Sequence, residues 1–365
     1  MGDTGPESAL PGTAPGAGEA GLRPARAGAD QGRVRVAVDA LGGDKAPDEI
    51  VAGAAAAASA EVEPTLFGPP GLEAKGLRHV EVSESIAMHE HPVESVKGRP
   101  DSSLVRAVKA VADGDCDVVV SAGNTGAVLA ASLLYVRRLP GVHRPGIGVV
   151  IPTKRGPSVL IDAGANADGR PEHLVQFAYM GAVFAEEILG VVSPEVRLLS
   201  IGEEDEKGNQ LTVDAHALLR SSDLRFTGNT EGRMLLAGGA DVVVADGFTG
   251  NVALKTLEGT IITLLDALRS ELGSTARGKL GGALMRPAAR KVRARLDPET
   301  YGGGYLLGLN GLVVIAHGSS TRVAIANAIR LAARGVEHRV VERLQERLSP
   351  GVLASARSTT PTAER

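Results

Sequence analysis

Short, almost wholly apolar runs, each followed by a segment with helical spacing, constrain the fold of this chain most strongly. Residues 34–39, 117–121 and 158–162 are runs of this kind, and helix-forming sequence follows each of them. Strands that are apolar throughout are typical of parallel sheets with helices on both faces. The alternation therefore predicts an α/β fold with a doubly wound, mostly parallel sheet.

The remaining elements extend this pattern along the chain. Further strands are expected at residues 148–151, 196–201, 241–246 and 311–316, and helices at residues 49–60, 103–112, 124–136 and 171–189. Together they predict a single domain over residues 33–348. Residues 1–32 are rich in Gly, Ala and Pro, and they are interpreted with the similar tail 349–365 as disordered extensions.

The composition excludes several classes of protein. A formal net charge of −4 gives no reason to expect nucleic-acid binding, and the single cysteine, Cys116, excludes an intramolecular disulfide. The sequence has no run of 18 apolar residues that would span a bilayer, and its first 32 residues lack the pattern of a signal peptide. We therefore expect a cytoplasmic protein.

One segment, residues 256–296, departs from the strand–helix alternation and is expected to form a helical protrusion. Its first part places Ile261, Leu265, Leu268 and Leu272 on one helical face. Residues 277–295 then contain seven Lys or Arg and no acid. We expect Arg286, Arg290, Arg293 and Arg295 to contact an anionic membrane surface or an acidic protein. A solvated or dimer-packed helix pair is the alternative.

Five of the expected strands end in loops rich in Gly, Asn, Ser, Thr and Asp. Ligands of open parallel sheets bind beyond the carboxyl ends of the strands, so we expect these loops to share one edge and one site. Glycine and helix N-termini bring backbone N–H groups to an anion, although a single such loop is equally explained by helix capping. The candidate substrate- and phosphate-binding residues are Asp39, Gly42, Gly43, Asp44, Ser121, Gly123, Asn124, Thr125, Gly126, Asn166, Asp246 and His317.

Lys207 and Asn251 are the candidate catalytic residues. Lys207 closes an acidic loop after the strand at 196–201, where its charge can bind phosphate or stabilise an oxyanion, or belong to a solvated charge run. Asn251 follows Gly250 at an expected helix start, as a cap or as an oxyanion donor. His317 can touch substrate or belong to a capping neighbourhood.

Other catalytic signatures are missing from the sequence. It contains no P-loop, no Gly-x-Gly-x-x-Gly after the first strand and no Gly-x-Ser-x-Gly elbow. Cys116 precedes a strand among three aspartates, which would raise the pKa of its thiol, so it is interpreted as structural. His89 and His91 lack further clustered ligands, so no metal site is expected.

The loop sequences closely resemble those of the phosphate acyltransferase family called PlsX. The resemblance is carried, in order, by VAVDALGGDKAPDEIV, SAGNTGAVLAAS, LIDAGANAD, LLSIGEEDEKGN, GNTEG, VVVADGFTGNVALKTLEG and YGGGYLLGLNGLVVIAHGSS, from about residue 34 to residue 348. It implies a three-layer α/β/α fold related to isopropylmalate dehydrogenases and phosphate acetyltransferases. It also implies a homodimer and places Lys207 and Asn251 in the active site.

The function implied by the resemblance is transfer of an acyl group from acyl carrier protein to inorganic phosphate, the first step towards phosphatidic acid. The acyl phosphate product would then pass to a membrane glycerol-3-phosphate acyltransferase. No cofactor or metal is required, because phosphate is itself a nucleophile and a thiol with a pKa of about 8.5 leaves readily. The alternatives are a phosphate acetyltransferase-like enzyme using acyl-CoA, a metal-dependent decarboxylating dehydrogenase, and a non-catalytic membrane-recruiting scaffold.

Overall fold

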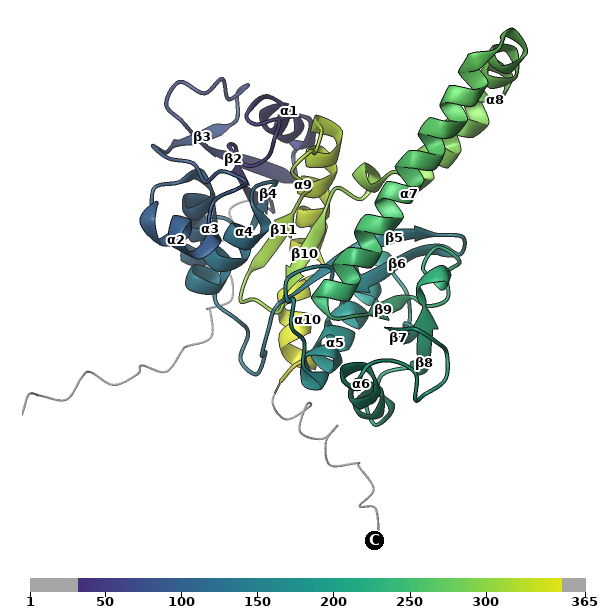
Figure 1. Cartoon of the computed structure of the whole chain (residues 1–365). Coiled ribbons are helices and arrows are strands. Elements are labelled where there is room, and N and C mark those ends of the chain that lie inside the picture. The colour runs from purple at the N-terminus through teal and green to yellow at the C-terminus, as the bar shows by residue number, and fades with distance from the viewer. Residues whose placement is uncertain (1–31, 350–365) are drawn as a thin grey trace, which may run out of the picture. The chain divides into compact units, whose positions relative to one another are not determined.

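The structure is a computed structural model that describes residues 32–349, without the side chains of residues 293–295 and 298 (Figure 1). The ends predicted to be disordered lie almost wholly outside this range. The strands are β1 (Val34–Asp39), β2 (Val62–Gly68), β3 (Arg78–Glu81), β4 (Val118–Ser121), β5 (Gly146–Thr153), β6 (Gly156–Ile161), β7 (Val196–Ser200), β8 (Phe226–Glu231), β9 (Val242–Val244), β10 (Gly304–Leu307) and β11 (Leu312–Ile315).

Helices cover both faces of the sheet that these strands form, and α7 and α8 extend away from it (Figure 1). They are α1 (Asp48–Ala57), α2 (Pro92–Gly98), α3 (Ser103–Asp113), α4 (Thr125–Ala131) with its π-helical continuation η1 (Ser132–Val136), α5 (Pro171–Leu189), α6 (Gln210–Arg220), α7 (Gly247–Ser274), α8 (Ala276–Leu296), α9 (Arg322–Glu337) and α10 (Val340–Arg347), with two short 3₁₀ turns, η2 (Gly232–Met234) and η3 (Pro298–Thr300).

The strand sequences are apolar throughout because both faces of the sheet are buried. Val36 and Val38 of β1 point into a core shared with α1, α5, α6, α9 and α10, whereas Ala37 between them points into a second core shared with α2, α3 and α4. This alternation follows from the two-residue period of a strand. The predicted three-layer α/β/α arrangement is confirmed.

Strand direction reverses in the middle of the sheet. The order is β3-β2-β1-β4-β11-β10-β5-β6-β9-β7-β8. The first five strands are mutually parallel, and so are the last four, but β10 is antiparallel to both neighbours and β5 is antiparallel to β6. The two parallel halves therefore run in opposite directions. The expectation that all five polar loops share one edge is wrong.

Helices α7 and α8 pack together as a two-helix arm that extends away from the sheet (Figure 1). α7 has 28 residues, which at a rise of 1.5 Å per residue span about 42 Å. It begins at Gly247, so the helix expected to start near residue 256 is the continuation of the one that carries Asn251. In the described part of the chain, no helix is long and apolar enough to cross a membrane.

Candidate active site

A buried carboxylate joins the loops after β1 and β4. Asp39 is 2% exposed, and its carboxylate accepts hydrogen bonds from the hydroxyls of Ser103 (2.6 Å) and Ser121 (2.7 Å). Ser121 Oγ in turn accepts the backbone N–H of Gly123 at 3.0 Å. Burial raises the pKa of Asp39, and the two hydroxyl bonds oppose that rise. Asp39 therefore sets the positions of two loops and is not itself open to a ligand.

Two predicted glycines are required by the close approach of these loops. A Cβ on Gly42 would lie 2.5 Å from Asp39 Oδ2 and 2.8 Å from the backbone nitrogen of Gly123. Gly43 has a φ of 106°, and a Cβ there would lie 3.0 Å from the carbonyl oxygen of Gly318. The loops after β1, β4 and β11 are thus packed against one another at one edge.

The start of α4 uses the Asn124 side chain for capping. Its Oδ1 accepts the backbone N–H of Ala127 at 3.1 Å, and its Nδ2 donates to the carbonyl of Met88 at 2.9 Å. Thr125 and Gly126 form the first turn of the helix. The capping interpretation therefore holds for Asn124.

His317 lies exposed beyond β11, beside the other two loops. Its Nδ1 is hydrogen-bonded by the backbone N–H of Ser319 at 3.2 Å, and Lys45 donates to the carbonyl of Ser319 at 2.7 Å. The backbone N–H of Asp44 donates to Gly318 O at 2.8 Å. Within residues 32–349 no partner is found for His317 Nε2, which leaves this nitrogen accessible to a ligand.

A second buried carboxylate organises the loop after β6, at the opposite edge. Asp162 is fully buried, and its Oδ1 accepts the backbone N–H groups of Ile147 (2.9 Å), Gly164 (3.1 Å) and Ala165 (2.9 Å). Oδ2 accepts two further bonds from Asn166, one from its backbone (2.9 Å) and one from its side chain (2.8 Å). Burial raises the pKa of Asp162. Asn166 is thus committed to the loop's own structure.

Asn251 is not the cap of its helix. Asp246 caps α7 by accepting the backbone N–H of Thr249 at 3.0 Å and its hydroxyl at 2.6 Å. Asn251 lies in the next turn with an exposed side chain, and a Cβ on Gly164 would be 3.4 Å from its Oδ1. The capping interpretation is therefore wrong for Asn251, whose amide faces the loop after β6.

Lys207 lies in the loop after β7, and two neighbouring side chains donate hydrogen bonds to the backbone carbonyls of this loop. Ser200 Oγ donates to the carbonyl of Lys207 at 2.7 Å, and Asn229 Nδ2 donates to the carbonyl of Glu204 at 2.7 Å. The Lys207 side chain is exposed, and its ammonium forms no ion pair with any residue of the described range. The acidic residues beside it in the sequence do not neutralise it.

The arrangement of the strands brings Lys207 and Asn251 to one edge. β6, β9 and β7 are neighbouring parallel strands, so the loops that carry Gly164, Asn251 and Lys207 emerge side by side. Ala163 and Ala127 belong to the same apolar core, which places the loop after β6 and the start of α4 on the same face of the sheet. The candidate residues thus form two groups, which lie at opposite edges of the sheet but over the same one of its two faces.

Three residues that support the candidate site were not selected from the sequence. Ser103 and Asp162 bond to the loops directly, and Asn229 reaches the Lys207 loop from β8. Asp162 stands at the end of the strand expected at residues 158–162, and that position was the available signal. Nothing in the sequence near Asn229 indicates its contact with residues 22 to 25 positions earlier.

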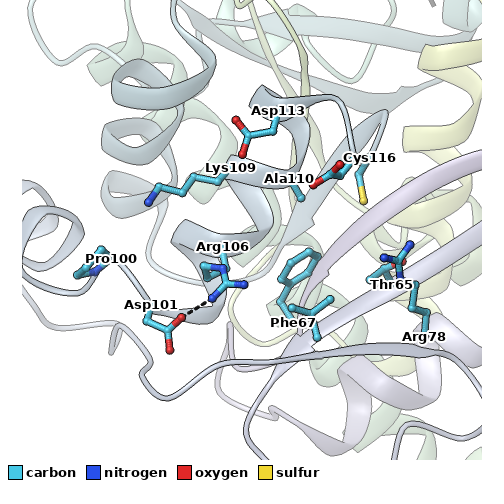
Figure 2. A pocket seen from close by; sticks show the side chains of 12 residues that line it. Thr65, Phe67, Arg78, Pro100, Asp101, Arg106, Lys109, Ala110, Asp113 and Cys116 are labelled. Carbon is cyan, nitrogen blue, oxygen red and sulfur yellow. Dashed lines mark hydrogen bonds and ion pairs between the residues drawn. The ribbon is translucent and has the colours of Figure 1, made fainter. Parts of the chain in front are cut away.

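Cys116 lines a pocket of about 460 Å³ beside α3, β2 and β3, away from both groups of loops. Figure 2 shows its thiol on one side of Phe67 and the Arg106–Asp101 ion pair on the other. Cys116 is 4% exposed, and burial raises the pKa of its thiol to about 11. Burial, more than the neighbouring aspartates, makes this thiol unreactive.

Cys116→Ala is therefore expected to retain most of the acyl-transfer activity, because the thiol is protonated at neutral pH and the thiolate is the reactive form. Steady-state rates of the variant and the parent protein, measured side by side, check this. Capture of an acyl group on Cys116 during turnover would contradict it.

The chain is similar to known phosphate acyltransferases over most of its length. Residues 34–343 match a family described as fatty acid synthesis protein. The chain is 48% identical over 326 residues to a phosphate acyltransferase of Thermosynechococcus vestitus, covering 86% of this chain and 95% of that protein. It is 43% identical over 330 residues to a phosphate acyltransferase of Heliobacterium modesticaldum, covering 87% and 98%.

Solved structures of lower sequence identity share the fold. A phosphotransacetylase from Streptococcus pyogenes superposes with a TM-score of 0.55 at 18% identity, covering 84% of this chain and 94% of that one. A branched-chain phosphotransacylase from Enterococcus faecalis gives the same TM-score at 17% identity, covering 84% and 99%. These likenesses concern the fold alone.

Proposed function

This chain belongs to the phosphate acyltransferase family, and we propose that it transfers a fatty acyl group from the thioester of acyl carrier protein to inorganic phosphate. The acyl phosphate would be the first intermediate towards phosphatidic acid and would pass to a membrane glycerol-3-phosphate acyltransferase. The observation that carries the proposal is that the Lys207 ammonium and the Asn251 amide lie at the same sheet edge and that, within residues 32–349, no side chain pairs with either. We propose that the protein acts in the cytoplasm.

The chemistry requires charge stabilisation and orientation. A phosphate oxygen attacks the thioester carbonyl carbon, the tetrahedral oxyanion collapses, and the C–S bond breaks to release the carrier thiolate, which takes a proton from solvent. Lys207 would neutralise phosphate or the oxyanion, and Asn251 would donate a hydrogen bond to the oxyanion. Holding both reactants in line supplies most of the remaining acceleration.

Twist of the sheet allows the two loop groups to serve one site. Five steps separate β4 from β9 in the sheet order. At 20–25° per step, twist accumulates to about 100–125°, so strands that are formally reversed have carboxyl ends directed only about 55–80° apart. We propose that the loops that carry Gly42, Gly123 and Thr125, together with His317, bind the phosphate or the pantetheine arm opposite Lys207.

Formation of acyl phosphate by the purified protein tests the proposal. Acyl carrier thioester and phosphate are incubated with the full chain, and hydroxylamine traps the product as a hydroxamate. Acyl-CoA in place of the carrier thioester tests the phosphate acetyltransferase-like alternative. If product forms only from acyl-CoA, the acyl donor is coenzyme A thioester and not the carrier protein. If neither thioester gives product, the non-catalytic scaffold is the alternative that remains.

We also propose that the arm contributes to a homodimer. Leu264 and Leu268, one turn apart on α7, are 68% and 48% exposed. Apolar side chains gathered on one projecting helix are typical of a surface covered by a partner. Sedimentation of the full chain as a monomer at micromolar concentration would count against a stable dimer.

The basic helix α8 is proposed to attach the protein to an anionic membrane surface. Arg286 and Arg290 are exposed on it, as are Leu284 (77%) and Met285 (52%), and an amphipathic basic helix can lie in the interface. Arg293 and Arg295 lie in the same helix, outside the described side chains.

Changing Arg286, Arg290, Arg293 and Arg295 together to Glu is expected to release the protein from anionic vesicles. Each basic residue near such a surface contributes about 1 kcal/mol, so the loss should weaken attachment by orders of magnitude. Cosedimentation measures it, and the rate with acyl carrier substrate in vesicle-free solution is the control. A raised KM with unchanged vesicle binding would instead make this the carrier-protein docking site.

A further inference from the structure

The loop between η1 and β5, residues 137–144, carries concentrated positive charge. It contains three Arg and one His and no acid, and residues 118–161 as a whole contain no Asp or Glu. Arg137, His143 and Arg144 are exposed. No carboxylate in the described part of the chain forms an ion pair with an arginine of this loop. The loop therefore presents cations that the rest of the described chain does not neutralise.

The backbone of this loop is fixed by side chains from two other elements. Gln176 of α5 accepts the backbone N–H of His143 at 2.8 Å and donates to the carbonyl of Gly141 at 2.8 Å. Asn166, in the loop after β6, donates through Nδ2 to the carbonyl of Pro145 at 2.7 Å. The cations are thus carried on a backbone that is already held in one position, which lowers the entropic cost of binding a partner.

Arg138 has a structural part in this loop, whereas Arg137 and Arg144 do not. Arg138 Nη1 donates to the backbone carbonyls of Val142, at 3.3 Å, and of His143. The side chains of Arg137 and Arg144 make no hydrogen bond to any residue between positions 32 and 349. Their planar guanidinium groups can therefore pair with the carboxylates of another molecule.

Arg170 adds a third exposed guanidinium from the residue that precedes α5. The nearby His173 shows how closely the charges gather, since its ring centroid lies 5.9 Å from that of His143. Burial lowers the pKa of His173, and the positive charges of His143, Arg144 and Arg170 lower it further. Arg170 and the loop 137–144 therefore belong to one surface.

Two carboxylates beside this surface do not cancel its charge. Asp168 and Glu172 flank Arg170 in the sequence, and neither forms an ion pair with it in the described chain. The guanidinium groups of Arg137, Arg144 and Arg170 outnumber them. We refer to these three arginines as the basic surface.

The loop after β6 connects the basic surface to the helix that carries Asn251. Asn166, whose side chain bonds to Pro145, also lies against the first residue of α7. A Cβ on Gly247 would be 2.5 Å from the carbonyl oxygen of Asn166 and 2.7 Å from its backbone nitrogen. One residue thus contacts both the end of the basic loop and the start of α7.

Arg170 also lies beside the elements that carry the two candidate catalytic residues. A Cβ on the preceding residue, Gly169, would be 3.2 Å from Asp246 Cβ and 3.2 Å from Leu211 Cδ2. Asp246 caps α7, and Leu211 stands in the first turn of α6, four positions after Lys207. The basic surface therefore borders the candidate active site.

We propose that the basic surface is where an acidic acyl carrier protein docks. The inference rests on the proposed function, in which the acyl group arrives on a carrier. Carboxylates of the carrier would pair with the three arginines, while the pantetheine arm reaches Lys207 and Asn251. A thioester on a tether needs its carrier held beside the site and not inside it, because tethering raises the local concentration of the reactant.

The apolar residues of the loop favour a protein partner over a membrane. A basic segment that lies in a membrane interface presents apolar side chains together with its cations. Leu139 and Val142 are only 2% and 5% exposed, whereas Leu284 and Met285 of α8 are 77% and 52% exposed. The basic surface offers charge without apolar side chains to insert, which suits the acidic surface of a soluble protein.

Arg137→Glu combined with Arg144→Glu tests the basic surface. Binding of carrier protein that bears its pantetheine arm but no acyl group is measured by fluorescence anisotropy with the full chain. At low salt the dissociation constant of the double variant should exceed that of the parent by about tenfold or more, because like charges now face each other. The parent should lose affinity between about 0.1 M and about 1 M salt, over which the Debye length falls from about 10 Å to about 3 Å.

Lys75→Glu combined with Arg78→Glu is the matched control. It makes the same change in net charge at two exposed positions, at and just before β3, the edge strand of the other half of the sheet. Carrier binding should equal that of the parent. Equal weakening by both pairs of substitutions would mean that net charge alone matters, and would overturn the inference.

Steady-state kinetics separate docking from catalysis. The Arg137→Glu, Arg144→Glu variant should raise KM for the acyl carrier thioester and leave kcat unchanged, since neither arginine touches the reacting atoms. A lower kcat with an unchanged KM contradicts a docking role. Parent-like carrier binding with lost vesicle cosedimentation would assign the surface to a membrane, and parent-like binding with dissociation of a dimer would assign it to a second copy. Either result overturns the inference.

The binding measurement does not depend on turnover, so it distinguishes this inference from the proposed function. If the parent forms no acyl phosphate but binds the carrier through the basic surface, the proposed function is wrong and the docking surface stands. If acyl phosphate forms and the double variant binds the carrier as tightly as the parent, the inference alone is wrong. Absence of carrier binding by the parent at low salt also overturns it.

Discussion

Lys207→Ala is expected to lower kcat by about 10²-fold or more, the scale of losing one preorganised charge-stabilising donor. The ammonium is exposed and unpaired within the described residues, so nothing nearby in the chain can replace it. The fold should be little affected, because substitutions at exposed loop positions usually change the free energy of unfolding by no more than about 0.5 kcal/mol. Initial rates of acyl phosphate formation at saturating thioester and phosphate measure the effect.

Lys255→Ala is the matched control for this prediction. Lys255 is also exposed, but it lies on α7 and pairs with Glu258 at 2.8 Å. It should keep its rate, which separates loss of the Lys207 charge from loss of any surface lysine. Lys207→Arg should recover part of the rate if charge is what matters. If Lys207→Ala has the same kinetics as the parent protein, Lys207 has no catalytic role and only belongs to a solvated run of charged residues.

The reversal of strand direction was accessible from the sequence, although it was not recognised there. A connection between parallel strands needs about a dozen residues or more, usually as a helix. Only residues 152–157 separate the expected strands at 148–151 and 158–162, which is enough for a hairpin alone. In the structure β5 and β6 are joined by a tight turn between Thr153 and Gly156. The separation of the polar loops into two groups follows from this turn.

Strand β8 was not predicted because its sequence is typical of a turn. Gly228 and Asn229 stand in its middle, and both residue types favour turns. The structure nevertheless buries Asn229 and Thr230 to 2% and 1% exposure. Asn229 is held there by hydrogen bonds from its side chain to the loop after β7, which lies 22 to 25 residues earlier and which local patterns do not record.

The loop compositions predicted where the polar residues lie but not what each one does. Asn124 and Asp246 cap helices, and Asn166 stabilises its own loop, whereas the Asn251 side chain has no hydrogen-bond partner in the described part of the chain. These four side chains have similar chemistry and similar sequence surroundings. What separates them is which backbone groups come within hydrogen-bond distance, and only the fold determines that.

Asp162→Asn is expected to be the most destabilising conservative change in the candidate site, at about 2–5 kcal/mol. Asp162 accepts five N–H hydrogen bonds while fully buried. An amide that keeps its oxygen towards Ile147, Gly164 and Ala165 turns its NH₂ group towards the two Asn166 donors. Each buried donor left unsatisfied costs about 1–3 kcal/mol.

Removal of the charge offsets part of that cost. Burial raises the pKa of Asp162, so the carboxylate itself is unfavourable there, and a neutral amide relieves this penalty. The net effect therefore distinguishes two views of the loop. Destabilisation within the expected range, measured by urea unfolding, means that hydrogen-bond geometry dominates. A stability equal to that of the parent means that burying the charge cost as much as its five hydrogen bonds contributed.

Asp168→Asn, at an exposed position of the same loop, should leave the free energy of unfolding unchanged and serves as the control. Should Asp162→Asn fail to fold, Asn166→Ala, which removes one side-chain donor to Asp162, should still show a measurable part of the loss. That smaller loss would arise because Oδ2 keeps the backbone N–H of residue 166 but loses its side-chain partner.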